Sequence, residues 1–207
     1  MLSLASFATA ETINFDSLSN GTTGTTLNNY LAGYGITVSG LTSGTYLEAA
    51  DDRLVYEGGY VEASSPHIYL TQGGISSAIS YTLNFQTPLS SLAFTRITVK
   101  GGPNSGNGTI YPEWSFQVFE GSSQIASGGQ GYYSLWNPNI DAAQTYSFTG
   151  QGITSVRFSG NGYGEAAFCS ALIDDIVTQP VPEPSTFALL GMGVAGMAFF
   201  GWRRRQK

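Results

Sequence analysis

Eighteen consecutive uncharged residues, Ser185 to Trp202, constrain this chain more than any other feature of its sequence. A helix of that length rises about 1.5 Å per residue and spans roughly 27 Å, close to the thickness of the hydrocarbon core of a bilayer. Arg203, Arg204 and Arg205 follow directly, and such clusters stay on the cytoplasmic side. The pattern predicts a transmembrane helix over 185–202. A buried core helix, the alternative, would leave three adjacent arginines with no acidic residue nearby.

A short proline-rich motif stands immediately before this helix. Pro182, Glu183 and Pro184 form a Pro-Glu-Pro triplet, so triplet, apolar helix and terminal arginine cluster follow one another in that order. This order resembles the PEP-CTERM sorting signal of bacterial exported proteins. The resemblance implies that an exosortase, a membrane-embedded cysteine transpeptidase or protease, cleaves near the triplet. The body would then pass from its membrane anchor to the cell surface or extracellular matrix, and this protein would be the substrate.

The N-terminal residues also suggest export. Ala8-Thr9-Ala10 is a small-residue pattern of the kind that signal peptidase cuts, which makes Glu11 the expected mature N-terminus. Residues 1–10 lack a basic start and a full apolar region, so we interpret them as the back half of a signal peptide. An ordinary flexible N-terminus is the alternative. The expected domains are therefore a partial signal over 1–10, a folded body over 11–179 and a sorting segment over 180–207.

The composition of the body favours strands over helices. Charged residues make up only 11% of the chain, and 27 glycines with many Ser and Thr take their place. Apolar segments recur about every ten residues between turn residues, which is typical of an antiparallel β-sandwich. No helical periodicity of comparable length is evident before Ser185, and the longest breaks fall at Asn20–Thr26, Gly101–Gly108 and Gly128–Asn139. The predicted strands are Thr12–Asp16, Gly35–Ser39, Tyr46–Glu48, Arg53–Glu57, His67–Thr71, Ala78–Gln86, Ser91–Val99, Trp114–Glu120, Gln124–Ser127, Thr145–Phe148, Ile153–Ser159 and Ala171–Val177.

The charge distribution excludes some functions. Between Glu11 and Asp175 the body has four basic residues and thirteen acidic ones, a formal charge of −9. A nucleic-acid role, which needs a basic face, is therefore not expected. One Cys cannot form an internal disulfide, and one His cannot build a multi-histidine metal centre.

Two pairs of segments indicate a more specific fold for the body. Near its start Ile13–Asp16 is followed by Tyr30–Ile36, and near its end Gly152–Phe158 leads to Ala171–Ile176. This arrangement is similar to the jelly-roll domains of PEP-CTERM proteins and, more distantly, to carbohydrate-binding modules of the galactose-binding-like class. The resemblance implies that the first and last strands lie together and hold a structural calcium ion.

Three aspartates are the candidate calcium ligands. Asp16, Asp174 and Asp175 could converge if the terminal strands pair, and Ca²⁺ prefers several oxygen ligands. Adjacent side chains on an extended strand face opposite ways, so Asp174 and Asp175 are not expected to enter one site together. The alternative is that one of them ends the sheet and the other is solvated.

Aromatic residues in a loop suggest sugar binding. Tyr132, Tyr133 and Trp136 lie in a Gly-, Asn- and Pro-rich stretch, where exposed rings can stack on sugars while Asn137 accepts hydroxyl hydrogen bonds. The alternative is that these rings close the end of the sandwich.

Catalysis has weaker support in the sequence. One acidic group consists of Glu48, Asp51, Asp52, Glu57 and Glu62. Glycoside hydrolysis needs two carboxylates across the scissile bond, and no spacing selects a pair from this group. Any Ser-His-Asp triad would have to use His67.

The sequence thus predicts an exported, non-catalytic polysaccharide-binding or adhesive module. An extracellular glycan hydrolase and a purely structural matrix protein remain the alternatives.

Overall fold

The computed structural model describes residues 9–50, 60–61, 68–74, 78–96, 98–99, 110–111, 114–130, 133–134, 143–161 and 172–181. Strands dominate this part of the chain and every strand pair is antiparallel, which confirms the all-β, antiparallel prediction. The predicted transmembrane helix over 185–202 and residues 1–8 of the predicted signal lie outside the described residues. Within the described ranges, no helix has the length and apolar character needed to cross a membrane.

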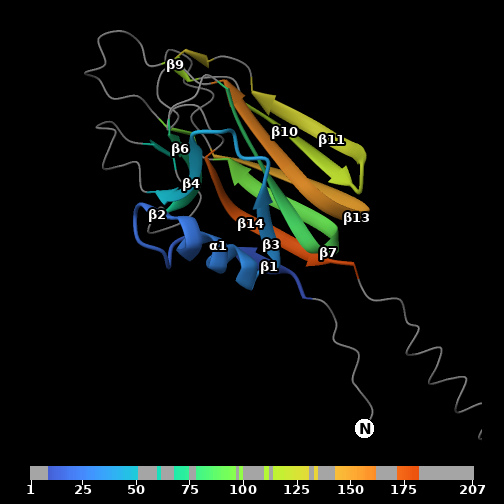
Figure 1. Ribbon diagram of the computed structural model, residues 1–207. Coiled ribbons are helices and arrows are strands. Elements are labelled where there is room, and N and C mark those ends of the chain that lie inside the picture. The colour runs from blue at the N-terminus through green and yellow to red at the C-terminus, as the bar shows by residue number, and fades with distance from the viewer. Residues whose placement is uncertain are drawn as a thin grey trace, which may run out of the picture.

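One sheet of ten strands forms most of the described structure (Figure 1). Its strands follow the order β11-β10-β13-β7-β14-β6-β4-β2, with β1 beside β14 and β3 beside β7. Two short ribbons, β5–β8 and β9–β12, complete the described strands. The bounds are β1 Glu11–Ile13, β2 Thr22–Thr23, β3 Ile36–Ser39, β4 Thr45–Ala50, β5 Tyr60–Val61, β6 Tyr69–Gly74, β7 Ala78–Arg96, β8 Thr98–Val99, β9 Ile110–Tyr111, β10 Trp114–Glu120, β11 Ser123–Gln130, β12 Tyr133–Ser134, β13 Gln144–Asn161 and β14 Ile173–Pro180.

Two long strands let this sheet fold into two layers. β7 and β13 were each predicted as two strands, but each runs on as one strand through a corner where their register shifts, between Thr149 and Ser155 of β13. On one side of the corner, β7 pairs with β3 and β13 pairs with β10. On the other side of the corner, β7 pairs with β14. We call the layer with β3, β10 and β11 the first layer and the layer with β14, β6 and β4 the second layer.

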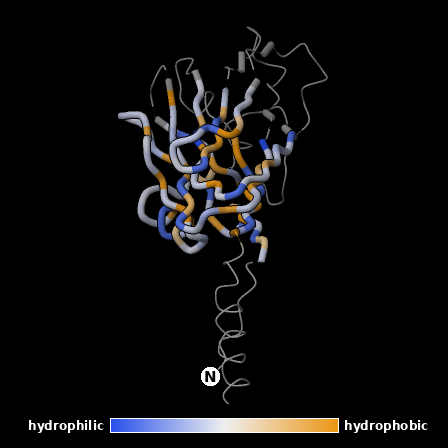
Figure 2. Tube along the Cα trace, turned by 90° about the vertical axis from the view of Figure 1, so that its right-hand side faces the viewer, coloured by the Kyte–Doolittle hydropathy of each residue, from blue (hydrophilic) through white to orange (hydrophobic). Residues whose placement is uncertain are grey.

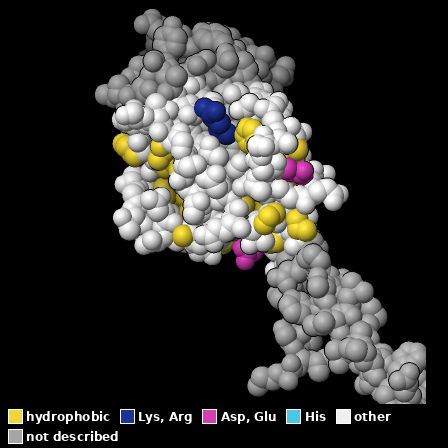
Figure 3. All heavy atoms as spheres, turned by 45° about the vertical axis from the view of Figure 1, so that its right-hand side comes forward, with side chains coloured by type: hydrophobic (Ala, Val, Ile, Leu, Met, Phe, Trp, Pro, Cys, Tyr) yellow, Lys and Arg dark blue, Asp and Glu magenta, His cyan; other side chains and the backbone are white. Residues whose placement is uncertain are grey.

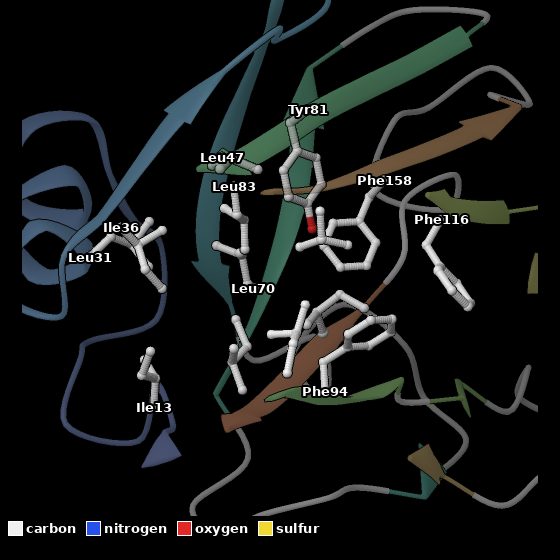
Figure 4. Close-up of a cluster of buried hydrophobic side chains, with 14 of the residues drawn as sticks. Ile13, Leu31, Ile36, Leu47, Leu70, Tyr81, Leu83, Phe94, Phe116 and Phe158 are labelled. Atoms are coloured by element: carbon white, nitrogen blue, oxygen red, sulfur yellow. The ribbon is translucent and has the colours of Figure 1, made fainter. Parts of the chain in front are cut away.

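Aromatic side chains pack between the layers. Phe94, on the second-layer half of β7, meets Phe116 and Phe158 of the first layer edge-to-face, with ring centroids 5.3 Å and 5.0 Å apart. Edge-to-face pairs of this kind add to the free energy of burial. Figure 4 shows these rings beside Leu70 and Leu83 in one continuous core. Hydrophobic and hydrophilic positions interleave along the strands (Figure 2), and in the first layer this alternation buries one side and turns the other outward.

A helix in the body corrects the sequence-based prediction. The break predicted at Asn20–Thr26 contains β2 and the start of α1, which spans Gly24–Gly33. Leu27 and Leu31, four residues apart, form its buried face, and the helix packs against β2, β3 and β4. At its end Gly35 adopts a positive φ of 68°, which glycine accepts without strain and which turns the chain into β3. The pattern was missed because only one helical turn separates the two leucines.

The terminal strands of the body lie side by side. β1 pairs with β14 through Glu11 and Thr178, Thr12 and Val177, and Ile13 and Ile176. This pairing agrees with the arrangement that the jelly-roll resemblance implied, and it places Asp16 at the same end of the sheet as Asp175.

Candidate functional site

The first layer presents a mainly polar surface to the outside, interrupted by the half-buried Phe119 of β10, which pairs with Ser155 and Gln124. Along its strands, core residues such as Leu83, Val118 and Val156 alternate with polar ones, so every second side chain leaves the core. The strand register then aligns these outward positions in rows across five strands. We call this surface the polar face; it consists of Thr37, Ser39, Ser80, Thr82, Asn84, Ser115, Gln117, Gln124, Ser127, Ser155, Arg157 and Ser159.

The rows of the polar face follow directly from the strand pairing. The middle row places Arg157 between Gln117 of β10 and Thr82 of β7, and continues to Ser127 on β11 and Ser39 on β3. Neighbouring strands lie about 4.8 Å apart, so hydroxyl and amide groups recur at that interval across the sheet.

Hydrogen bonds between side chains orient the amides of this surface. Gln117 donates through Nε2 to Oε1 of Gln124 at 2.6 Å, joining β10 to β11. Asn84 donates through Nδ2 to Oγ of Ser39 at 2.9 Å and to the carbonyl of Thr37 at 3.2 Å, joining β7 to β3. These bonds hold the amide groups in fixed orientations.

The polar face carries almost no charge. Arg157 is its one charged member, and it is exposed. Figure 3 views the molecule with the β10, β11 and β13 side turned forward, and uncharged atoms dominate it, with acidic atoms only near the margin. This surface therefore differs from the strongly acidic body as a whole, and its chemistry is that of hydroxyls and amides.

The predicted calcium ligands occupy an irregular end of β14. The register of β14 against β7 shifts between Asp174 and Val177, and Asp175 has a positive φ of 45°. Asp174 is fully buried and Asp175 half-buried. Burial, and secondly the negative charge of Asp16, raises the pKa of Asp175, so these two carboxylates lie close enough to repel.

The third aspartate, Asp174, has different neighbours, and its charge acts on Tyr30. Burial raises the pKa of Tyr30 to about 12, with a bond to Tyr34 and a small effect from Asp174 adding to the rise. The Tyr30 hydroxyl donates to the carbonyl of Asn14. Among the described residues, no three His, Cys, Asp or Glu side chains are grouped so that they could hold one metal ion. A three-carboxylate site thus does not fit. A calcium ion here would draw on Asp16, Asp175 and backbone oxygens.

The predicted sugar-binding loop falls mostly outside the described part of the chain. Tyr132, Trp136 and Asn137 lie outside it. Tyr133 begins β12, where its backbone pairs with Tyr111 of β9. The proposed stacking role of this loop therefore stays a prediction.

One residue of the predicted acidic group is described. Glu48 lies half-buried on β4, opposite Thr71 of β6, and burial raises the pKa of its carboxyl. The other members and His67 lie outside the described residues, so a catalytic role for this group stays a hypothesis. The residues outside are Asp51, Asp52, Glu57 and Glu62.

The tail matches a known family of sorting signals. Residues 180–205 match the PEP-CTERM protein-sorting motif. The chain carries a PEP-CTERM sorting motif. This match confirms the interpretation of Pro182 to Pro184 and Arg203 to Arg205 as parts of one signal, and such a signal implies an exported protein. The motif covers only the tail of the chain, and its residues beyond Val181 lie outside the described part.

Other comparisons concern the body. No curated protein matches the chain. Among solved structures, it is similar to the K2 cleaved adhesin domain of Lys-gingipain, at 11% identity and a TM-score of 0.45, covering 83% of this chain and 98% of that one. It is also similar to the CBM22-1 xylan-binding domain from Paenibacillus barcinonensis Xyn10C (9% identity, TM-score 0.39, 87% and 100% covered). A family 32 carbohydrate-binding module from C. perfringens NanJ, in complex with galactose, is similar at 12% identity and a TM-score of 0.29, with 70% and 93% covered.

The polar face was missed by the sequence analysis. Its signal was present in the segment Ser80–Asn84, where Ser, Thr and Asn alternate with Tyr81 and Leu83. Alternation predicts a strand with one solvated side, but it cannot tell which strands will align their polar sides. That alignment depends on the register of strands that are distant in sequence.

Proposed function

We propose that this exported protein binds an uncharged extracellular polysaccharide through its body and does not cleave it. The polar face is the observation that carries this proposal. Sugar hydroxyls both donate and accept hydrogen bonds, and planar amide and guanidinium groups can contact two neighbouring hydroxyls at once. Asn84, Gln117 and Arg157 supply such groups on adjacent strands, each oriented by the sheet.

The charge of the body favours an uncharged glycan. A formal charge of −9 repels polyanions, and a single arginine on the polar face is too little to reverse that repulsion. An extended chain lying across the strands would meet polar groups on each of them. Repetition of weak contacts is how a flat surface can hold a polymer.

The aromatic loop would add a stacking contribution. Tyr132, Tyr133 and Trp136, with Asn137, remain our predicted sugar-stacking residues. If Trp136 stacks on sugar, Trp136→Ala loses polysaccharide retention with little change in melting temperature. If the ring closes the end of the sandwich, the same change costs about 3–5 kcal/mol, and retention unchanged in such a destabilised variant would remove this loop from the proposal.

Export through the tail is the second part of the proposal. We propose that an exosortase recognises Pro182, Glu183 and Pro184 while the 185–202 segment holds the protein in the membrane, and that processing delivers the body to the cell surface or matrix. Replacing the triplet with alanines should leave export intact and retain the tail. The mass of the surface protein measures this, and identical processing of the variant and the parent would contradict it.

The binding assignment is tested with matched glutamine variants. Gln117→Ala removes an oriented amide from the polar face, whereas Gln151→Ala removes an exposed glutamine at the corner of β13. We expect weaker retention on insoluble uncharged polysaccharides for the first variant only, with equal melting temperatures. Release of reducing sugar by the parent would favour the hydrolase alternative. Absence of retention on every polysaccharide would favour the structural matrix alternative.

A further inference from the structure

The outer edge of the main sheet is formed by β11. Within the described part of the chain, β11 pairs with β10 and with no other strand, and it ends the strand order of the sheet (Figure 1). Ser123, Gln124, Ser127 and Gly128 are all exposed, and Ile125 keeps 39% of its surface accessible. Eight residues of backbone therefore have a free side that could pair with another strand.

This edge lacks two features that normally prevent strand pairing, charged residues and prolines. Its sequence, Ser-Gln-Ile-Ala-Ser-Gly-Gly-Gln, contains no charged residue and no proline. The other short strands at the margins of the sheet offer far less backbone, because β1, β2 and β3 have three, two and four residues. One bulge, between Val118 and Phe119, interrupts the ladder near the turn. Ala126 to Gln130 remain in regular register with β10.

The glycines of this edge are required by the fold itself. A Cβ on Gly128 would lie 2.6 Å from the ring of Phe116, and one on Gly129 would lie 2.2 Å from the carbonyl oxygen of Trp114. Larger residues are therefore excluded there, so the edge stays flat and narrow. A second strand could approach it closely.

Charge indicates which partner fits. Most of the acidic body repels a second copy, but the stretch from Gly121 to Gln130 is neutral. The nearest acid, Glu120, accepts a bond from the backbone N–H of Gln151 at 2.6 Å, on the β13 side of β10 and away from the free edge. As far as the described residues go, two copies can thus meet edge to edge without bringing acidic groups together.

We propose that β11 pairs antiparallel with β11 of a second copy of this chain. Such a pair would join the two polar faces into one surface, since β11 is the outer strand of that face in each copy. A pair of short strands buries little area, so the association is weak in solution and strengthens where many copies share one surface. A polysaccharide long enough to cross both faces would then be held by both.

Two measurements on the full chain in detergent test this pairing without any polysaccharide. Sedimentation over about 10 μM to about 1 mM measures self-association. Hydrogen exchange locates it, because pairing would slow the exchange of amides in Ser123–Gln130 as concentration rises and leave those of β10 unchanged. Association through the apolar tail would not change exchange in β11.

Matched lysine variants complete the experiment. Ser127→Lys places a charge on the edge strand, whereas Ser115→Lys places the same charge one strand inward on β10, on the same face and equally exposed. We expect the first to weaken self-association at least about tenfold and the second to leave it unchanged. Thermal melting checks that both are folded, and Ile125→Lys provides a second edge variant should Ser127→Lys fail to fold.

The outcomes separate the proposal from its alternatives. Concentration-dependent protection in β11 that is lost with Ser127→Lys supports it. A monomer throughout the range, self-association that leaves β11 exchange unchanged, or equal effects of the two lysines would each overturn it. Protection of β11 that appears only with a different protein would assign the edge to that partner and would also overturn it.

Discussion

The two layers of the body differ on their outer faces, although the same two long strands run through both. On the first layer, Thr82 of β7 is partly exposed within the polar face. Thirteen residues further along the same strand, Thr95 of the second layer is only 8% exposed. Its outward neighbours on β14 and β6 are buried as well, because Tyr69 and Asp174 have no accessible surface and Thr71 keeps 2%, whereas its partner on β13, Thr145, is exposed.

This difference separates polar groups that maintain the structure from those that can meet a ligand. Thr95 and Thr145 share a hydrogen bond of 3.0 Å between their hydroxyls, and a buried hydroxyl needs such a partner. On the first layer the outward groups face solvent and can exchange water for a sugar hydroxyl. The proposed function therefore locates binding on the first layer, and it predicts that the buried outward residues of the second layer affect stability alone.

The largest expected effect on stability concerns Tyr69, the aromatic residue on the outer face of the second layer. Tyr69→Ala should cost about 3–5 kcal/mol of unfolding free energy, because it removes a fully buried ring from the second layer. Gln117→Ala, also outward-facing but on the first layer, should change stability by less than about 0.5 kcal/mol. Urea denaturation of both measures this, and equal costs would show that the two outer faces do not differ as described.

Calcium gives the next largest effect, at the end of β14. If Asp16 and Asp175 bind the ion in the folded state only, calcium at about 100 times its Kd should add roughly 2.7 kcal/mol of stability. Asp175→Asn keeps a residue that tolerates the positive φ but removes one charge, so the gain should shrink sharply. Melting in calcium and in chelator is the measurement, and unchanged midpoints in the parent would remove the proposed ion.

The pH dependence without calcium tests the same pair. The pKa of Asp175 is higher in the folded state than in the unfolded state. Protonation of Asp175 therefore stabilises the fold. This stabilisation is fully present at pH values below the unfolded-state pKa and is lost as the pH rises through the folded-state pKa. The stability difference between the parent and Asp175→Asn should therefore narrow as a neutral solution is acidified. A difference that is constant with pH would mean that neither burial nor the charge of Asp16 raises the pKa of Asp175.

The sequence predicted the strands well because their apolar positions alternate locally. Trp114–Glu120 was predicted with its observed bounds, and the sorting motif was recognisable from three ordered features of the tail. Helix α1 was missed because its packing depends on β3 and β4, which approach Leu27 and Leu31 only in the folded chain. Tertiary contacts, more than helix propensity, hold so short a helix.

The candidate site was harder to predict because it depends on register. The polar face needs β3, β7, β13, β10 and β11 to align, and its members Thr37 of β3 and Ser159 of β13 are 122 residues apart in sequence. The expectation that Asp174 and Asp175 would not share a site stays a prediction. The irregular register and positive φ at Asp175 were not predicted, since no glycine marks the position.

The smallest expected effect compares two threonines of β7 directly. Thr95→Val keeps the shape of the side chain but removes the hydroxyl bonded to Thr145, and should cost about 1 kcal/mol. Thr82→Val makes the same change on the polar face, where water solvates the hydroxyl, and should leave stability nearly unchanged while weakening polysaccharide retention. Denaturation and retention assays on both variants give four values. The comparison of the two faces requires that Thr95→Val lower stability alone and that Thr82→Val lower retention alone. A retention loss caused by Thr95→Val at unchanged stability would instead move the binding surface to the second layer.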